Sequence, residues 1–426
     1  MLRFDENNRV LREDKYNAII VGVQRDEDIE YSMEELSGLV EAAGASVLGQ
    51  MVQKMEKPNT ATFIGKGKVE ELAGLVKSME ADMVVFNDEL TGMQLRNLED
   101  SIGVRIIDRP ILILDIFASR ATSREGKLQV ELAQLKYRLP RLTGFGRSLS
   151  RLGGGIGTRG PGEKKLETDR RHIERRMNDI KEELAQLKNT RSVQRAKREK
   201  SNVPVVALVG YTNSGKSALM NRILSDTKKE EKTVLEKNML FATLDVQQRS
   251  VTLESGRQFI LVDTVGFVSK LPHSLVEAFK ATLEEVTYAD LLLHVVDASY
   301  ENHDFHIGVT DKVMKEIGAG AKEKIMVYNK TDLPHSEIIP VPGCDSIEIS
   351  AKYGNNIYKL IEKIEEKIFG DYIEAAFLIP YERGDLSSYL CSEAEVKKMD
   401  YKEQGTYFEA VLKEADYRRL KQYEVV

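Results

Sequence analysis

The stretch Gly210-Tyr-Thr-Asn-Ser-Gly-Lys-Ser217 decides the fold of the central part of this 426-residue chain. It has the spacing G-x-x-x-x-G-K-S, follows the apolar run VPVVALV and precedes the helical pattern SALMNRIL. Glycines in such a loop let backbone N–H groups point inward around an anion, and the helix that follows adds positive potential. The lysine of such a loop reaches the β- and γ-phosphates, and the serine hydroxyl binds Mg²⁺. The stretch therefore predicts a nucleoside triphosphate site with Lys216 and Ser217 in these two roles.

The sequence around this loop alternates apolar runs of strand length with helical segments. Runs that are apolar at nearly every position suit strands buried on both faces, and intervening helices suit parallel pairing. The strand runs are VPVVALVG, RQFILVDTVG, DLLLHVVDAS, KIMVYNKTD and SIEISAK, and the helical segments are 216–225, 272–287, 303–318 and 354–369. The pattern predicts a doubly wound α/β domain over residues 201–370.

Two further motifs fall where predicted strands end. Asp263-Thr-Val-Gly266 closes the run RQFILV, so Asp263 can hold Mg²⁺ through water and the Gly266 N–H can meet the γ-phosphate. Asn329-Lys330-Thr-Asp332 closes the run KIMVY, and the Asp332 carboxylate can accept hydrogen bonds from guanine N1–H and the 2-amino group. Adenine offers neither donor, and a site built on such bonds rejects the analogue by roughly 10⁴-fold or more. The sequence therefore predicts a GTPase with GTP and GDP as ligands.

Three other positions complete the predicted site. Ser350-Ala351-Lys352 ends the next strand, where a backbone N–H can contact guanine O6. Thr243 lies in the polar stretch 226–248, and we expect it to close on Mg²⁺ and the γ-phosphate as an ordering switch. Asn213 leaves two alternatives open: a K⁺ ion near the phosphates, or a side chain that only stabilises the loop.

Residues 1–115 show a second alternation of strands and helices. NAIIVGV (17–23) has the composition of a strand and MEELSGLVEAAG (33–44) that of a helix, and the alternation continues to VRIID. This order predicts an N-terminal parallel α/β domain. The residues after it keep a helical period up to Pro140.

The segment 116–200 differs from both α/β regions. Glycines crowd residues 144–162, which predicts a loop, and apolar residues then recur at spacings of three, four and seven. We expect this loop to join the two arms of an antiparallel helical pair, formed by residues 116–138 and 166–200.

The charge of this middle segment points to a polyanionic partner. Residues 136–200 contain 19 Lys and Arg against 8 Asp and Glu, a net of +11, whereas the whole chain carries −6 and the remainder therefore −17. A basic stretch on an acidic body is typical of contact with nucleic-acid phosphates. A solvated helix face and an unstructured linker have the same composition and remain alternatives. The residues expected to bind RNA are Arg147, Arg151, Arg159, Lys164 and Lys165.

The end of the chain and its overall composition bound the remaining possibilities. Residues 371–426 predict a small α+β domain with a hairpin near Gln404-Gly405. The chain has two cysteines and no apolar run near the ~18 residues of a membrane span. Its N-terminus is charged from residue 3 and lacks the apolar stretch of a signal peptide. We therefore expect a cytoplasmic monomer without a membrane span, with peripheral membrane association as an open alternative.

Four stretches give the chain a more specific resemblance. The segments GGGIGTRGPGEKKLE, LETDRRHIERR, FATLD (241–245) and DTVGF (263–267) resemble the HflX family of ribosome-associated GTPases, and the resemblance covers nearly the whole chain. It implies GTP hydrolysis stimulated by the ribosome, binding to the large ribosomal subunit and its rRNA, and splitting or rescue of stalled or idle ribosomes under stress. It also implies Mg²⁺ as cofactor. Some family members use ATP through the N-terminal domain, but residues 1–115 contain no P-loop.

The resemblance and the motifs together give the following expected site. Nucleotide contacts are Gly210, Tyr211, Thr212, Asn213, Ser214, Gly215, Lys216, Ser217, Phe241, Thr243, Asp263, Gly266, Asn329, Lys330, Asp332, Ser350, Ala351 and Lys352. Lys216, Thr243 and Gly266 are the expected catalytic residues, and Ser217, Thr243 and Asp263 (through water) the expected Mg²⁺ ligands.

One position departs from the better-known switch GTPases, which place a water-orienting glutamine after D-x-x-G. Here that residue is Phe267, whose ring cannot orient water by hydrogen bonding. We therefore expect slow intrinsic turnover and stimulation by the partner, because an external catalytic group contributes 10³–10⁵ in rate. The alternative function is a GTP-gated, rRNA-binding assembly factor or chaperone of the large subunit that does not split ribosomes.

Overall fold

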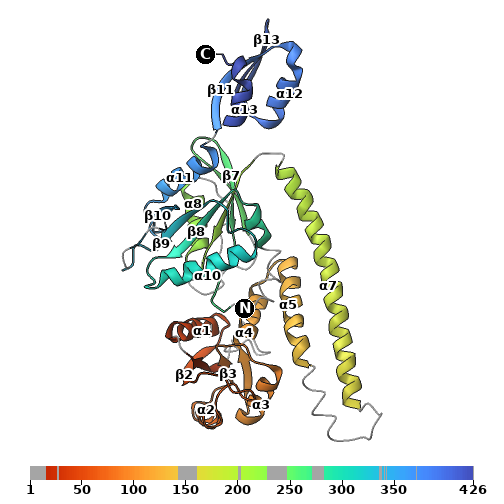
Figure 1. The fold of residues 1–426 in the computed structure, drawn as a ribbon, viewed down its shortest axis with the longest axis vertical. Coiled ribbons are helices and arrows are strands. Elements are labelled where there is room, and N and C mark those ends of the chain that lie inside the picture. The colour runs from red at the N-terminus through yellow and green to blue at the C-terminus, as the bar shows by residue number, and fades with distance from the viewer. Residues whose placement is uncertain are drawn as a thin grey trace, which may run out of the picture.

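The computed structural model describes residues 16–25, 28–142, 161–199, 203–227, 247–270, 283–334, 338–339, 341, 343–370 and 372–425. Figure 1 shows four parts in these residues: an N-terminal α/β layer, a pair of helices, a second α/β layer and a small C-terminal sheet with two helices. The multidomain α/β class predicted from the sequence is confirmed.

The N-terminal part is a four-stranded parallel sheet with the strand order β2-β1-β3-β4. Its apolar strand β1 is buried on both faces, since Ala18 and Ile20 join one hydrophobic cluster and Ile19 and Val21 another. Burial on both faces is what makes the run near-continuously apolar. The elements are β1 (Asn17–Gln24), α1 (Glu30–Ala42), β2 (Ser46–Lys54), α2 (Lys66–Met79), β3 (Met83–Phe86), α3 (Gly92–Ile102) and β4 (Arg105–Asp108).

The helical period before Pro140 forms two helices, and the prediction of one continuous arm was wrong. These helices are α4 (Arg109–Arg120) and α5 (Arg124–Leu142), and Pro140 lies inside the second one. Ser123 precedes α5, and its hydroxyl accepts a backbone N–H of the first turn at 2.9 Å. A capping hydroxyl favours a new helix start, which hydrophobic periodicity does not reveal.

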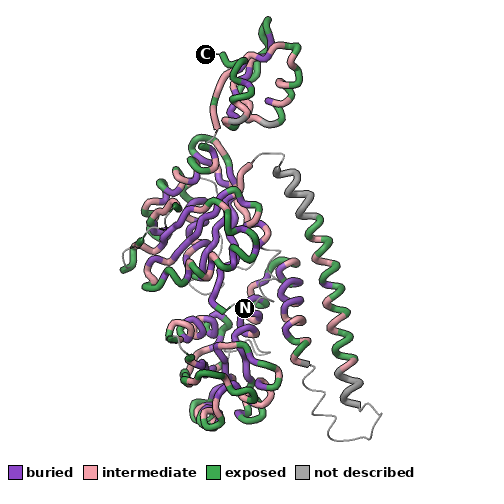
Figure 2. Tube along the Cα trace, in the orientation of Figure 1, coloured by how far each residue is buried: buried purple, intermediate pink, exposed green. Residues whose placement is uncertain are grey.

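Helix α5 forms the predicted antiparallel pair with α7 (Pro161–Glu199). The buried seam holds Leu128 and Leu132 of α5 and Ile180 of α7. Among residues 167–189 of α7, whose burial is described, most of the others are exposed or half-buried, as Figure 2 shows. Two ion pairs join the helices, Arg124–Glu183 and Glu131–Arg176. The residue number rises along α5 while that of its partner falls along α7, as antiparallel packing requires.

The predicted glycine loop 144–162 lies outside the described residues except at its end, where α7 already begins at Pro161. The expected RNA-binding residues Arg147, Arg151 and Arg159 lie outside the described part of the chain. Lys164 and Lys165 belong to α7, but their side chains are not among those described.

The second α/β layer is a six-stranded sheet with the order β10-β9-β8-β5-β7-β6. All its pairs are parallel except β6–β7, an antiparallel edge hairpin that the sequence did not predict. The carboxyl ends of the parallel strands therefore meet at one edge, where such sheets bind ligands. The elements are β5 (Val205–Val209), α8 (Lys216–Asp226), β6 (Gln247–Thr252), β7 (Gln258–Asp263), β8 (Leu291–Asp297), α10 (His303–Glu316), β9 (Lys324–Asn329), β10 (Asp345–Glu348) and α11 (Ile357–Phe369).

The C-terminal part is a three-stranded antiparallel sheet with the order β11-β13-β12. Its core holds Phe377 and Phe408, both fully buried against the two helices of this part. No helix of the described residues is both long enough and apolar enough to cross a bilayer. The elements are β11 (Tyr372–Ile379), α12 (Gly384–Glu393), β12 (Glu395–Lys402), β13 (Gly405–Lys413) and α13 (Glu414–Leu420).

Candidate nucleotide site

The P-loop (residues 210–217) connects β5 to the first turn of α8. Gly210 has φ +150°, and a Cβ there would lie 2.2 Å from the Val295 carbonyl oxygen. Gly215 has φ +91°, and a Cβ there would lie 2.2 Å from Asn329 Nδ2. Both positions therefore require glycine for their left-handed backbone and for their close contacts with neighbouring strands.

Lys216 points back over the loop that it follows. Its ammonium donates hydrogen bonds to the carbonyl oxygens of Gly210 at 3.1 Å and of Tyr211 at 2.7 Å. Burial lowers the pKa of Lys216 to about 8, and the nearby Asp263 carboxylate opposes part of that shift. A buried cation that faces the loop is available to phosphates bound inside it.

Ser217 and Asp263 come together although 46 residues separate them. The Ser217 hydroxyl donates a hydrogen bond of 2.6 Å to Asp263 Oδ2 at the end of β7. A hydroxyl and a carboxylate are hard oxygen ligands, and Mg²⁺ is held by one or two carboxylates together with substrate phosphates. The described residues hold no cluster of three His, Cys, Asp or Glu side chains that could bind a metal without the nucleotide. The Ser217 hydroxyl and the Asp263 carboxylate therefore fit a Mg²⁺ ion that binds together with GTP.

The residues after Asp263 lie against the P-loop. The Thr212 N–H donates to the Phe267 carbonyl oxygen at 2.7 Å, and the Phe267 N–H donates to the Gly210 carbonyl oxygen at 3.2 Å. A Cβ at Gly266 would lie 2.7 Å from Thr212 Cα and 3.0 Å from Lys216 Nζ. The Phe267 side chain is buried in the core of the second sheet, so it has no access to an attacking water.

The guanine side of the site is built from the ends of β9 and β10. Asn329 joins the loops, since its amide donates to the Ser214 carbonyl at 2.9 Å and accepts the Ala351 N–H at 2.9 Å. The Ser350 hydroxyl donates to Asp332 Oδ1 at 2.6 Å and leaves the other carboxylate oxygen for a base. Asp332 itself is exposed, so its carboxylate is accessible to a base that binds from solution.

Two basic residues flank the guanine-binding loops. Lys330 adopts φ +67° and its ammonium lies 2.6 Å from Asp297. Lys352 is exposed next to Tyr353, with its ammonium 5.0 Å from the ring centroid. Four loops predicted from the sequence thus converge at the carboxyl edge of one sheet. Phe241 and Thr243 lie outside the described residues.

The side chain of Tyr211 faces away from the loop and toward the N-terminal part. Its hydroxyl donates to Glu35 of α1, and its ring stacks on His306 with centroids 3.9 Å apart. Sequence reasoning missed Glu35 and its ion-pair partner Arg109, because a charged residue in an amphipathic helix gives no sign of burial. Burial and the adjacent Glu35 carboxylate raise the pKa of Tyr211 well above its usual range.

The chain resembles known proteins along most of its length. Three family profiles match in sequence: "GTP-binding GTPase N-terminal" at residues 30–118, "GTP-binding GTPase Middle Region" at 120–198 and "50S ribosome-binding GTPase" at 205–330. A crystal structure of a GTP-binding protein from Sulfolobus solfataricus with GDP aligns over 83% of this chain and 98% of that chain, with 26% identity and a TM-score of 0.45.

Curated relatives give closer matches. The GTPase HflX of Caldanaerobacter subterraneus is 52% identical over 93% of this chain and 90% of its own length. The GTPase HflX of Escherichia coli is 38% identical over 96% of this chain and 97% of its own length. The chain therefore belongs to the HflX family of GTPases, and it binds and hydrolyses GTP.

Proposed function

We propose that this GTPase binds the large ribosomal subunit in its GTP form, splits or rescues stalled and idle ribosomes, and leaves after hydrolysis. The observation that carries the proposal is a strongly basic segment joined to a G domain in which four guanine-nucleotide loops converge. Figure 1 shows α7 running alongside the G domain, and the Lys188 ammonium of α7 lies 2.7 Å from Glu284 of that domain. The chain segment between α5 and α7 carries Arg147, Arg151 and Arg159. Those residues belong to the segment with a net charge of +11. Arginine-rich arms suit rRNA because arginine pairs with phosphate and stacks on bases.

The chemistry assigned to this chain is positioning and charge stabilisation. Lys216 holds the β- and γ-phosphates, and the Gly266 N–H stabilises charge on the γ-phosphate. Ser217, Thr243 and, through water, Asp263 would hold Mg²⁺ together with the nucleotide, and the ion would supply charge neutralisation at the phosphates. Phe267 is buried in the position of a water-orienting glutamine. We therefore propose that the attacking water is ordered only on the ribosome, which would make hydrolysis follow binding.

A second candidate is a large-subunit assembly factor that uses the same site and the same arm. The two functions differ only in the fate of intact ribosomes. The test is sedimentation of ribosomes with the full chain and a non-hydrolysable GTP analogue. GDP and a variant that lacks residues 144–162 serve as controls. Splitting predicts larger subunit peaks only with the analogue and the intact arm. Intact ribosomes accompanied by protein on free large subunits would favour assembly instead.

A further inference from the structure

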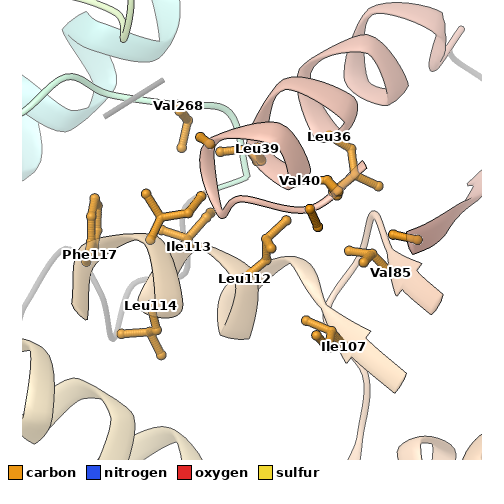
Figure 3. Close-up of a cluster of buried hydrophobic side chains, with 14 of the residues drawn as sticks. Leu36, Leu39, Val40, Val85, Ile107, Leu112, Ile113, Leu114, Phe117 and Val268 are labelled. Atoms are coloured by element: carbon orange, nitrogen blue, oxygen red, sulfur yellow. The ribbon is translucent and has the colours of Figure 1, made fainter. Parts of the chain in front are cut away.

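The two ends of the nucleotide site are held in place in different ways. Val268, which follows the D-x-x-G segment, is 1% exposed, and Figure 3 shows it beside Leu39 of α1 and facing Ile113 of α4. Apolar packing therefore anchors the chain next to the phosphate end. At the guanine end, residues 352–355 are exposed or half-buried, so apolar packing does not hold this stretch in place.

The predicted donor to guanine O6 is a backbone N–H of Ser350, Ala351 or Lys352, and the structure narrows this choice. The Ser350 N–H donates to the Asn355 carbonyl oxygen at 3.2 Å. The Ala351 N–H donates to Asn329 Oδ1 at 2.9 Å. Of these three described residues, Lys352 is therefore the one whose N–H remains for the base.

Lys352 lies between a buried stretch of chain and an exposed turn. Ser350 and Ala351 before it are 0% and 5% exposed and belong to the interior of the G domain. After it, the Gly354 N–H donates to the Ser350 carbonyl oxygen at 2.7 Å and closes a turn over residues 350–354. The position of the Lys352 N–H therefore depends on how firmly Gly354 is held.

An arginine of α8 lies directly against this turn. Gly354 has φ +82°, and a Cβ there would lie 2.1 Å from Arg222 Nη2, 2.5 Å from Cζ and 2.9 Å from Nε. Three atoms of the guanidinium group thus lie against the Gly354 backbone. Any side chain at position 354 would be strained by its φ angle and would collide with Arg222. The guanidinium group therefore covers the turn at the residue whose N–H closes it.

The guanidinium group is oriented from its own helix. Arg222 Nε donates to Asp226 Oδ2 at 3.0 Å, one turn further along α8, and both side chains are 35% exposed. A partly exposed ion pair of this spacing contributes little to stability, so we interpret its effect as orientation of the guanidinium. The same helix begins at Lys216. Helix α8 thus carries a phosphate contact in its first turn and a contact to the guanine-binding turn near its end.

We propose that Arg222 is a positioning residue for guanine recognition. Its guanidinium group holds the turn 350–354 in the conformation in which the Lys352 N–H meets guanine O6. The proposal concerns the choice of base by the G domain and does not depend on the ribosomal role proposed above.

Loss of the guanidinium group should weaken one base contact more than the others. The turn would lose the group that packs on Gly354, so the exposed residues from Lys352 onward would become more mobile. Ser350 is fully buried and holds Asp332 at 2.6 Å, so the contacts with guanine N1–H and the 2-amino group should persist. The phosphate contacts of Lys216 lie at the other end of α8 and should persist as well.

The experiment is a competition titration of the full chain with GDP, a non-hydrolysable GTP analogue and 6-thioguanosine diphosphate. The last ligand keeps N1–H and the 2-amino group but replaces O6 with sulfur, which accepts hydrogen bonds weakly. One neutral hydrogen bond contributes roughly 2- to 12-fold in affinity. We therefore expect the unmodified chain to prefer GDP over the thio analogue by about fivefold.

The test variant is R222A, and R418A is the matched control because Arg418 and Glu414 form an exposed i,i+4 pair on α13. In R222A, we expect the affinities for GDP and for the GTP analogue to fall equally, by about fivefold. Affinity for the thio analogue should stay within twofold, so the preference for GDP disappears. The KM for GTP should rise with kcat unchanged, because only binding of the base is altered. R418A should match the unmodified chain in every measurement.

A second variant separates the packing of Arg222 from its charge. R222K keeps the charge that faces Asp226 but has no planar guanidinium group to cover Gly354. We expect R222K to behave like R222A, and it decides the matter if R222A proves unstable.

Four results would overturn the proposal. Unchanged GDP affinity in R222A would show that the turn needs no support from α8. An equal loss for GDP and for the thio analogue would show a general effect on the site rather than on the O6 contact. A normal preference for GDP in R222K would assign the effect to the ion pair with Asp226. Equal binding of the two diphosphates by the unmodified chain would mean that the turn makes no contact with O6.

Discussion

The two parallel sheets of this chain have the same architecture but use their carboxyl edges differently. The edge of the G domain gathers Lys216, Asp263, Asn329 and Asp332 from loops with recognisable motifs. The edge of the N-terminal sheet carries no motif and is covered by residues of the G domain, including Ser269. A fold therefore supplies a place for a ligand, and the side chains at that place decide whether a nucleotide or the protein itself occupies it.

The difference also shows in how charge is treated at the two edges. In the G domain, Asp332 is exposed and Lys216 is buried facing loop carbonyls. The carboxylate is therefore accessible to guanine, and the ammonium is accessible to phosphates bound in the loop. In the N-terminal sheet, the charges of Glu35 and Arg109 neutralise each other inside the protein. The charges of the first edge are placed to bind a ligand. The buried ion pair of the second edge makes a specific contact between two parts of the chain.

The largest expected effect is on stability at the N-terminal edge. Arg109→Met leaves the Glu35 carboxylate buried without its cation, and removal of one partner from a buried pair costs about 3–5 kcal/mol. Arg170→Met is the control, because Arg170 and Glu174 form an exposed pair on α7 and such pairs contribute about 0.3–0.5 kcal/mol. Denaturant-dependent hydrogen exchange of β1 amides measures both changes. Equal losses in the two variants would mean that the buried pair does not stabilise the edge.

Loss of Lys216 is expected to have the next largest effect and to act at the other edge. Lys216→Ala removes the cation that faces the phosphates, and loss of one such group costs roughly 10²–10³ in kcat. Lys359→Ala, at an exposed lysine of α11, is the matched control. Release of phosphate from GTP measures the rate. A K216A enzyme with nearly unchanged turnover would place the chemistry elsewhere in the molecule.

Base selection should change at Asp332. Asp332→Asn replaces one acceptor for guanine with an amide donor, while the Ser350 hydroxyl can still donate to Oδ1. Loss of a hydrogen bond to a charged group costs about 1.5–3 kcal/mol, so GTP affinity should fall roughly 10- to 150-fold. Xanthosine triphosphate, which carries a carbonyl at C2, should gain affinity. Asp304→Asn, at an exposed aspartate of α10, should change neither. Unaltered preference for GTP in D332N would remove Asp332 from base recognition.

The smallest expected effect is a pH dependence of nucleotide binding. The pKa of Lys216 is lowered to about 8 by burial, and bound phosphates favour its charged form. The group must therefore take up a proton on binding above that pKa. Affinity should be nearly constant below about pH 7, fall about fivefold from pH 8 to pH 9, and approach a tenfold fall per pH unit above that. The same titration in K216A measures any pH dependence that comes from the nucleotide itself. If the affinity of K216A for nucleotide changed with pH in the same way, Lys216 would not be the group that titrates.

Sequence patterns predicted the G domain well because its motifs fix both backbone and chemistry. Glycine is required at positions 210 and 215 by the φ angles and close contacts there, so the spacing of these glycines identifies the P-loop in the sequence. The edge strand β6 was missed because its polar sequence, QQRSVT, does not have the composition of a buried strand. The break before α5 was missed because Ser123 acts through one capping hydrogen bond rather than through periodicity.

The contact between the N-terminal sheet edge and the G domain could not be predicted because its partners are far apart in the chain. Glu35 and Ser269 are separated by 234 residues and meet only through tertiary packing. Nothing in MEEL or in VGFVSK marks either residue as buried. Tyr211 occupies a variable position of the loop motif, so its side chain could be assigned a direction only from the structure.

We expect only the carboxyl edge of the G-domain sheet to bind a nucleotide. Equilibrium dialysis of the full chain with GDP, and separately with ATP, tests it most directly. The account predicts one GDP per chain, weaker GDP binding in K216A, and no saturable ATP binding in either protein. Saturable ATP binding that persists in K216A would place a nucleotide at the N-terminal edge and contradict the account.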